Sequence, residues 1–129
     1  MIGVFDSGIG GLTGVRELMA LLPEQEILYL GDTARTPYGS KSRDTIVQYS
    51  LNNAEFLAQR GADIIVIACN TASSYAYEAL CAKFQMPVFE VIGPGARLAL
   101  QCTRKMRIGV IGTRATISSG CYEEKIAQL

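Results

Sequence analysis

The stretch Ile64–Ser73, IIVIACNTAS, joins an apolar, β-branched run to an abrupt polar end at Cys69, Asn70 and Thr71. Such a run is typical of a buried parallel strand, and open α/β sheets place their chemistry just beyond the ends of such strands. Taken alone, Cys69 is more simply interpreted as a small core residue, because free cysteine is among the most buried residue types. The rest of the sequence has to decide between packing and chemistry at this position.

Strand-like and helix-like segments alternate on both sides of this stretch. Apolar strands are expected at residues 2–5, 27–30, 62–69, 87–92 and 107–111, and helices at 12–22, 44–60, 73–84, 96–102 and from 117 onward. Asp44 is the expected cap of the second helix. This alternation across short loops predicts an α/β fold with a doubly wound, mainly parallel sheet. The loops that follow the strands then gather at one edge of that sheet.

A short repeat near the C-terminal end indicates a second structural unit. Ile108–Thr113, IGVIGT, resembles Ile2–Ser7, IGVFDS, and both segments deliver a hydroxyl to a loop before a helix. The repeat predicts a first α/β domain over residues 1–94. Residues 95–129 would then hold a crossover helix and the first βα unit of a second, pseudo-symmetric α/β domain. A single βα unit cannot form a domain, so we expect the chain to be truncated.

Composition argues against several classes of protein. Twelve basic and twelve acidic side chains cancel, so we expect no nucleic-acid-binding face. The longest apolar run is too short to cross a bilayer and no signal peptide is recognisable, which predicts a cytoplasmic protein without membrane contact. The sequence has no histidine and no CxxC pair, so we predict no metal site. Its cysteines are Cys69, Cys81, Cys102 and Cys121.

Polar residues follow several of the expected strands, and a parallel sheet would bring them to one edge. They are Asp6 and Ser7, Tyr38 and Gly39, Cys69, Asn70 and Thr71, with Thr113 and Thr116 if the second unit packs across that edge. Each motif alone is an ordinary turn or helix cap. Together they suit a small polar ligand that carries carboxylates. A helix N-terminus favours the thiolate of Cys69, and without a histidine partner we expect that thiolate to act as a base.

A dinucleotide site is a second interpretation of the first loop. Gly8 and Gly10 open a helix, and Asp32 ends the next strand, where a ribose-binding acid would lie. However, Thr13 takes the place of the third glycine of that fingerprint. The carboxylate of Asp6 would also repel a pyrophosphate. NAD binding, which would depend on Asp32, is therefore the weaker hypothesis.

Four motifs together resemble the cofactor-independent aspartate/glutamate racemase family, and in particular the amino-terminal half of its glutamate racemases. The motifs are Phe5–Val15, Tyr29–Ser42, Ala68–Ser73 and Ile108–Ile117. The resemblance implies two pseudo-symmetric α/β domains with the active site between them. It also implies an isomerase that interconverts L- and D-glutamate without a cofactor and supplies D-glutamate for peptidoglycan, hence for cell wall biogenesis and cell shape. A homodimer is left open.

The resemblance also implies roles for particular residues. One cysteine thiolate removes the α-proton and a second cysteine, on the opposite face of the substrate, returns one. Cys69 matches the first of these, and Asp6 is a candidate to assist its proton transfer. The substrate-binding positions are matched by Asp6, Ser7, Tyr38, Gly39, Asn70, Thr71, Thr113 and Thr116.

The second cysteine of the family lies in a later GCTHYP-type motif, which these 129 residues do not contain. Cys81, Cys102 and Cys121 lack that motif and are expected to have packing roles. We therefore predict that the 129-residue chain alone has no appreciable racemase activity and folds poorly. The alternative hypothesis is a non-catalytic glutamate-binding or interaction module.

Overall fold

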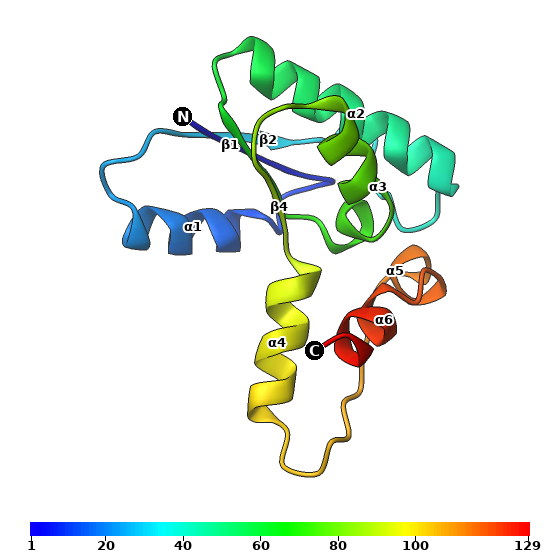
Figure 1. Cartoon of the computed structure of the whole chain (residues 1–129). Coiled ribbons are helices and arrows are strands. Elements are labelled where there is room, and N and C mark those ends of the chain that lie inside the picture. Colours follow the sequence, from blue (N-terminus) through cyan, green and yellow to red (C-terminus); the bar gives the residue numbers. More distant parts are fainter.

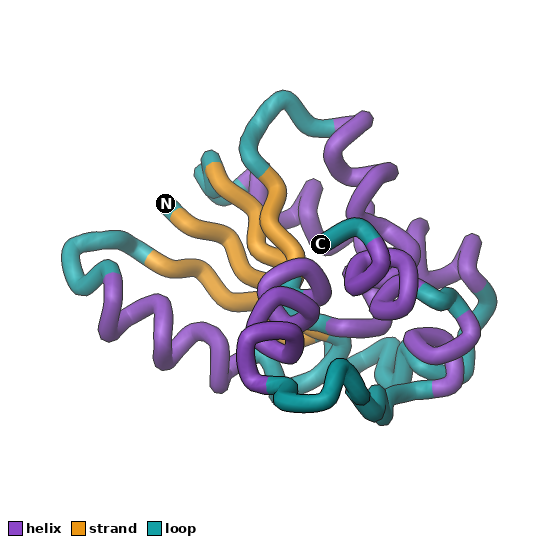
Figure 2. The backbone as a smooth tube through the Cα atoms, turned by 60° about the horizontal axis from the view of Figure 1, so that its bottom comes forward, coloured by secondary structure: helices purple, strands orange, loops and turns teal.

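A parallel sheet of four strands lies at the centre of the fold (Figure 1), and the computed structural model describes all of residues 1–129. The strands are β1 (Ile2–Asp6), β2 (Ile27–Gly31), β3 (Ile64–Ile67) and β4 (Val88–Glu90). Their order is β2-β1-β3-β4, and every pairing is parallel. Figure 2 shows the strands side by side with the helices around them. The predicted α/β class and parallel sheet are confirmed.

Helices cover both faces of the sheet because side chains alternate along its central strand. The helices are α1 (Leu12–Leu21), α2 (Arg43–Gln59), α3 (Asn70–Lys83), α4 (Ile92–Cys102), α5 (Arg114–Ser118) and α6 (Cys121–Ala127). Phe5 of β1 belongs to the larger core, which α2 and α3 cover, whereas Val4 belongs to a smaller core with Val15 of α1. Both side chains from β1 are fully buried. The sheet is therefore doubly wound, as the sequence predicts.

The segment after β4 turns away from the sheet (Figure 1). There α4 packs against α6, and α5 packs against α3. Through the contact of α5 with α3, residues near position 115 reach the carboxyl edge of the sheet. None of the six helices has the length and hydropathy needed to cross a bilayer.

The prediction of a strand at residues 107–111 is wrong. This segment is not part of the sheet, and the side chain of Ile111 is almost fully exposed, at 98%. Its apolar, β-branched composition favours a strand, but a strand forms only where a neighbouring strand satisfies its backbone N–H and C=O groups. Here the neighbouring elements are helices, so the segment stays unpaired.

Several helix ends also differ from the sequence-based expectation. Ser42, not Asp44, caps α2, because its hydroxyl accepts a hydrogen bond of 3.2 Å from the backbone N–H of Thr45. The third helix begins at Asn70 rather than at residue 73, and α4 begins at Ile92 rather than at residue 96. The last helix is divided into α5 and α6 by Gly120, whose φ of 68° a helix cannot contain.

Candidate active site

Cys69 lies where β3 ends and α3 begins, and it is the N-cap residue of α3. Its sulfur accepts a hydrogen bond of 3.4 Å from the backbone N–H of Ala72. Its thiol donates to the Ser7 hydroxyl, with 3.2 Å between Sγ and Oγ. Only 5% of Cys69 is exposed. The side chain of Cys69 is therefore buried and also hydrogen-bonded. N–H groups at the start of a helix stabilise a negative charge on such a sulfur.

Asp6 ends β1 and holds the loop that follows it. One carboxylate oxygen accepts a hydrogen bond from the backbone N–H of Ser7, and the other accepts one from Gly11, both at 2.8 Å. The Ser7 hydroxyl lies 3.5 Å from Oδ1 of Asp6 and, as noted, 3.2 Å from the sulfur of Cys69. Ser7 thus connects the carboxylate with the thiol.

A close approach of backbone segments explains the glycine at position 11. A Cβ atom there would lie 2.8 Å from Cβ of Asp6 and 2.9 Å from Cβ of Ala68, distances that real Cβ atoms do not tolerate. Any larger residue would push the loop away from Asp6. The glycine therefore keeps the carboxylate and its two backbone donors together.

Sequence reasoning did not single out Tyr29, which supports the same loop from β2. Its hydroxyl donates a hydrogen bond of 3.0 Å to the carbonyl of Gly8. Burial, together with the nearby charges of Asp6 and Cys69, raises the pKa of Tyr29 above its ordinary value of 10.0. The phenol therefore stays protonated and remains a donor. A tyrosine inside an apolar strand gives no sequence signal for this contact.

The side chain of Tyr38 is buried in the larger core, with 1% of it exposed. Its hydroxyl donates to the carboxylate of Asp32 and accepts a hydrogen bond of 2.9 Å from the side-chain amide of Asn53. The phenol is therefore committed to a buried network. The carbonyl of Tyr38 accepts a hydrogen bond of 3.0 Å from the backbone N–H of Lys41, so the backbone N–H groups of residues 38 and 39 are the polar groups of this turn that remain without a partner.

Gly39 follows directly and touches α5. Its carbonyl accepts a hydrogen bond of 3.2 Å from the backbone N–H of Ala115. A Cβ atom on Gly39 would lie 2.5 Å from Cβ of Thr113. The absence of a side chain at position 39 therefore permits the close packing of this loop against the start of α5.

Arg35 completes the buried network around Tyr38. Its guanidinium lies 2.7 Å from the carboxylate of Asp32, donates a hydrogen bond of 2.7 Å to the side-chain carbonyl of Asn53, and stacks 4.3 Å above the ring of Tyr49. Asp32 is 7% exposed. Its carboxylate is paired inside the fold, which leaves it poorly placed to bind the ribose of a dinucleotide.

These contacts control the ionisation of Asp32. Burial alone would raise the pKa of its carboxyl group, but hydrogen bonds from Arg35 and Tyr38 outweigh that effect and hold the pKa below its ordinary value of 3.8. The ionised carboxylate is therefore the form that the folded chain prefers.

We expect the unfolding free energy of Asp32→Asn to depend less on pH in the acidic range. A carboxyl group whose pKa is lower in the folded chain stabilises the fold above its unfolded-state value, about pH 4, and loses that contribution as the pH falls through the folded-state pKa. The variant should unfold more easily at neutral pH and show a shallower decline below about pH 4. Urea unfolding at a series of pH values, followed by circular dichroism, measures both effects. Glu24→Gln, which removes an exposed carboxylate, is the control, and an unchanged decline in Asp32→Asn would contradict this prediction.

Contacts among three threonine hydroxyls join the start of α5 to the first turn of α3. Thr71 lies 2.8 Å from Thr113 and 3.4 Å from Thr116, and the latter two lie 3.0 Å apart, all measured between hydroxyl oxygens. Thr113 also caps α5 by accepting from the N–H of Thr116. The structure therefore joins Thr113 and Thr116 to the residues that follow β3.

Asn70 lies beside this cluster and borders a cavity of about 470 Å³. Its side-chain carbonyl accepts a hydrogen bond of 2.6 Å from the hydroxyl of Tyr122. The cavity is lined by residues 108–113 and by Asn70, Gly95, Ala99, Thr116, Tyr122 and Ile126. Asp6, Ser7 and Cys69 do not line it. The predicted site residues thus form two groups, which the consecutive residues Cys69, Asn70 and Thr71 connect.

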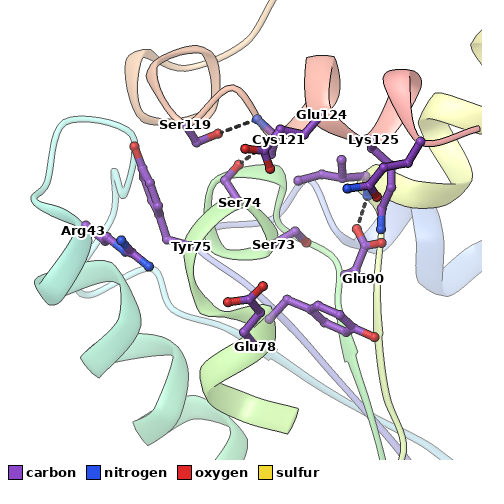
Figure 3. A pocket seen from close by; sticks show the side chains of 13 residues that line it. Arg43, Ser73, Ser74, Tyr75, Glu78, Glu90, Ser119, Cys121, Glu124 and Lys125 are labelled. Carbon is purple, nitrogen blue, oxygen red and sulfur yellow. Dashed lines mark hydrogen bonds between the residues drawn. The ribbon is translucent and has the colours of Figure 1, made fainter. Parts of the chain in front are cut away.

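A separate cavity of about 420 Å³ holds none of the predicted site residues. Its wall is mostly polar and comes from α2, α3, β4, α4 and α6, with Ser119 from the turn between α5 and α6 (Figure 3). Cys121 lines it, with its sulfur 3.3 Å from the hydroxyl of Ser74. Cys81 and Cys102 are exposed. These three cysteines have no hydrogen bond with Asp6, Ser7 or Cys69.

Comparison with known proteins gives a consistent result. The Asp/Glu/Hydantoin racemase family model matches residues 14–129. The glutamate racemase of Persephonella marina is 57% identical over 125 residues, which are 97% of this chain and 48% of that relative. The structure of glutamate racemase from Aquifex pyrophilus matches with a TM-score of 0.96 at 54% identity, covering 98% of this chain and 50% of the other.

A glutamate racemase structure from Francisella tularensis subsp. tularensis in complex with D-glutamate is also similar. It matches with a TM-score of 0.89 at 45% identity, over 98% of this chain and 47% of that one. The chain therefore spans about half the length of the curated relatives that it matches.

Proposed function

Because this chain belongs to the Asp/Glu/Hydantoin racemase family, we propose that it provides the Cys69 half of a cofactor-independent glutamate racemase. The observation that carries the proposal is the position of Cys69. Its sulfur lies at the start of α3, 3.2 Å from the Ser7 hydroxyl, which in turn contacts Asp6. A thiol in this setting has donors ready for its anion and a carboxylate within reach of its proton.

In this proposal Cys69 acts as the base that takes the α-proton of glutamate. The sulfur forms the new S–H bond, and the electron pair of the broken Cα–H bond stays on the carbon, delocalised into the adjacent carboxylate. Before that step, the thiol proton passes to Oγ of Ser7 while the hydroxyl proton of Ser7 passes to Asp6. The Ala72 N–H and the re-formed Ser7 hydroxyl then stabilise the thiolate. Asp6 assists because it can receive the thiol proton through the Ser7 hydroxyl.

The remaining site residues would bind the substrate. The backbone at Tyr38 and Gly39, the hydroxyls of Thr71, Thr113 and Thr116, and the side chain of Asn70 offer donors for carboxylates. We assign residues 1–94 to the first racemase domain and 95–129 to the start of the second. The contacts of Thr113 and Thr116 with Thr71 then cross from one to the other. The wider role that we propose is the supply of D-glutamate for peptidoglycan in the cytoplasm.

Inversion at Cα needs an acid on the face opposite the base, because a single base returns a proton to the face from which it took one. Cys81 and Cys102 are exposed, and the thiol of Cys121 lies against Ser74, so we assign that role to none of them. In this proposal the second thiol lies outside these 129 residues. The 129-residue chain alone should therefore exchange a proton without racemising its substrate.

Exposure of the chain to each enantiomer of glutamate in heavy water tests the proposal. A single thiolate on one face should place deuterium at Cα of one enantiomer only, with its configuration retained. Mass spectrometry measures the deuterium and chiral chromatography measures the configuration. Binding of glutamate without any exchange would instead favour the non-catalytic module. Rapid racemisation, proportional to the concentration of the chain, would contradict the assignment of the second thiol to another segment.

A further inference from the structure

We propose that Tyr122 is a positioning residue that orients the side-chain amide of Asn70 in the substrate site. The proposal rests on the proposed function for the role of Asn70. It starts from one contact between segments that are far apart in the sequence. The hydroxyl of Tyr122, on α6, lies 2.6 Å from Oδ1 of Asn70, at the start of α3.

The direction of this hydrogen bond matters because an amide has one accepting end and one donating end. When the Tyr122 hydroxyl donates to Oδ1 of Asn70, the NH₂ group at the other end remains free to donate to a carboxylate. The reversed amide would present its carbonyl oxygen to the ligand and repel a carboxylate. No other side chain forms a hydrogen bond with the Asn70 amide, so Tyr122 alone selects between the two orientations.

The surroundings of Tyr122 keep its hydroxyl in place. The ring lies against α4, where a Cβ atom on Gly95 would lie 3.3 Å from the hydroxyl oxygen. Burial, with the nearby charges of Cys121 and Glu90, raises the pKa of Tyr122 above 10.0, so that the phenol stays protonated. Tyr122, Asn70 and Gly95 also line one cavity, together with Thr113 and Thr116. The orientation of the Asn70 side chain, at the start of α3, therefore depends through Tyr122 on the positions of α4 and α6.

Tyr122→Phe tests the proposal, because it removes the hydroxyl and keeps the ring. We expect the side-chain NH₂ signals of Asn70 to shift in heteronuclear NMR of the isotope-labelled chain. Glutamate affinity, measured by calorimetry, should fall about three- to tenfold, as the loss of one hydrogen bond predicts. The urea midpoint should change little. Asn70→Asp identifies the signals by removing them.

Tyr75→Phe is the matched control, since Tyr75 lies on α3 like Asn70 and its hydroxyl makes no hydrogen bond in the structure. Asn70 signals that stay in place in Tyr122→Phe, or that move equally in the control, would overturn the proposal. So would a shift of these signals with glutamate affinity unchanged. If the unmodified chain binds no glutamate, the proposed function fails instead, and the Asn70 signals still decide whether Tyr122 orients the amide.

Discussion

Replacement of Cys69 by serine is expected to abolish deuterium exchange at Cα of glutamate. A serine hydroxyl stays protonated near neutral pH, so the variant lacks the base that the proposed reaction needs. General acid–base catalysis contributes about 100- to 10,000-fold to a rate, and a loss of that size would put the exchange below detection. The exchange is measured by mass spectrometry of glutamate recovered from heavy water.

The same substitution should leave the fold intact, which separates catalysis from stability. Serine is a favoured N-cap residue, and its oxygen can accept the backbone hydrogen bond that the sulfur of Cys69 accepts from Ala72. Glutamate binding should therefore persist in Cys69→Ser. Cys81→Ser is the control, because Cys81 is exposed and lies outside the site. Exchange that survives in Cys69→Ser, or that disappears in Cys81→Ser, would remove Cys69 from its proposed role.

The sheet could be predicted from the sequence because its signals are local. Each buried strand is a short apolar run that ends at polar residues, and the helix between two such runs requires them to be parallel. The same logic predicted that the segments after β1 and β3 would meet, and the contact of Ser7 with Cys69 follows from that topology. Topology thus gives the neighbourhood of a residue without any knowledge of its rotamer.

The direction of individual side chains could not be predicted in this way. Tyr38 lies in a polar turn, and nothing local indicates that its ring enters the core to meet Asn53, which lies 15 residues later. The pairing of Asp32 with Arg35 depends on the same burial. Residues 107–111 show the opposite case. Their composition predicts a strand, but no neighbouring strand is present to pair with them. In both cases segments that are distant in the sequence decide the outcome.

Replacement of Tyr38 by alanine is expected to cause the largest loss of stability. Tyr38 is the largest of the fully buried side chains, and deletion of a buried aromatic ring costs about 3–5 kcal/mol of unfolding free energy. The variant also removes a hydrogen-bond partner from both Asp32 and Asn53. The total unfolding free energy of domains of this size is about 5–15 kcal/mol, so the variant should lose a large fraction of its stability. Urea unfolding, followed by circular dichroism, measures the change.

Tyr38→Phe separates the ring from its hydroxyl. It keeps the packed volume and loses the two hydrogen bonds, so we expect a smaller cost of about 1–3 kcal/mol. The buried ring holds the loop that carries Gly39, so Tyr38→Ala should also loosen the contact of Gly39 with Ala115 and weaken glutamate binding. Tyr38→Phe should keep most of the affinity for glutamate. The reverse order, with Tyr38→Phe losing affinity as completely as Tyr38→Ala, would mean that the hydroxyl itself serves the ligand. In that case the buried network seen here would have to open when glutamate binds.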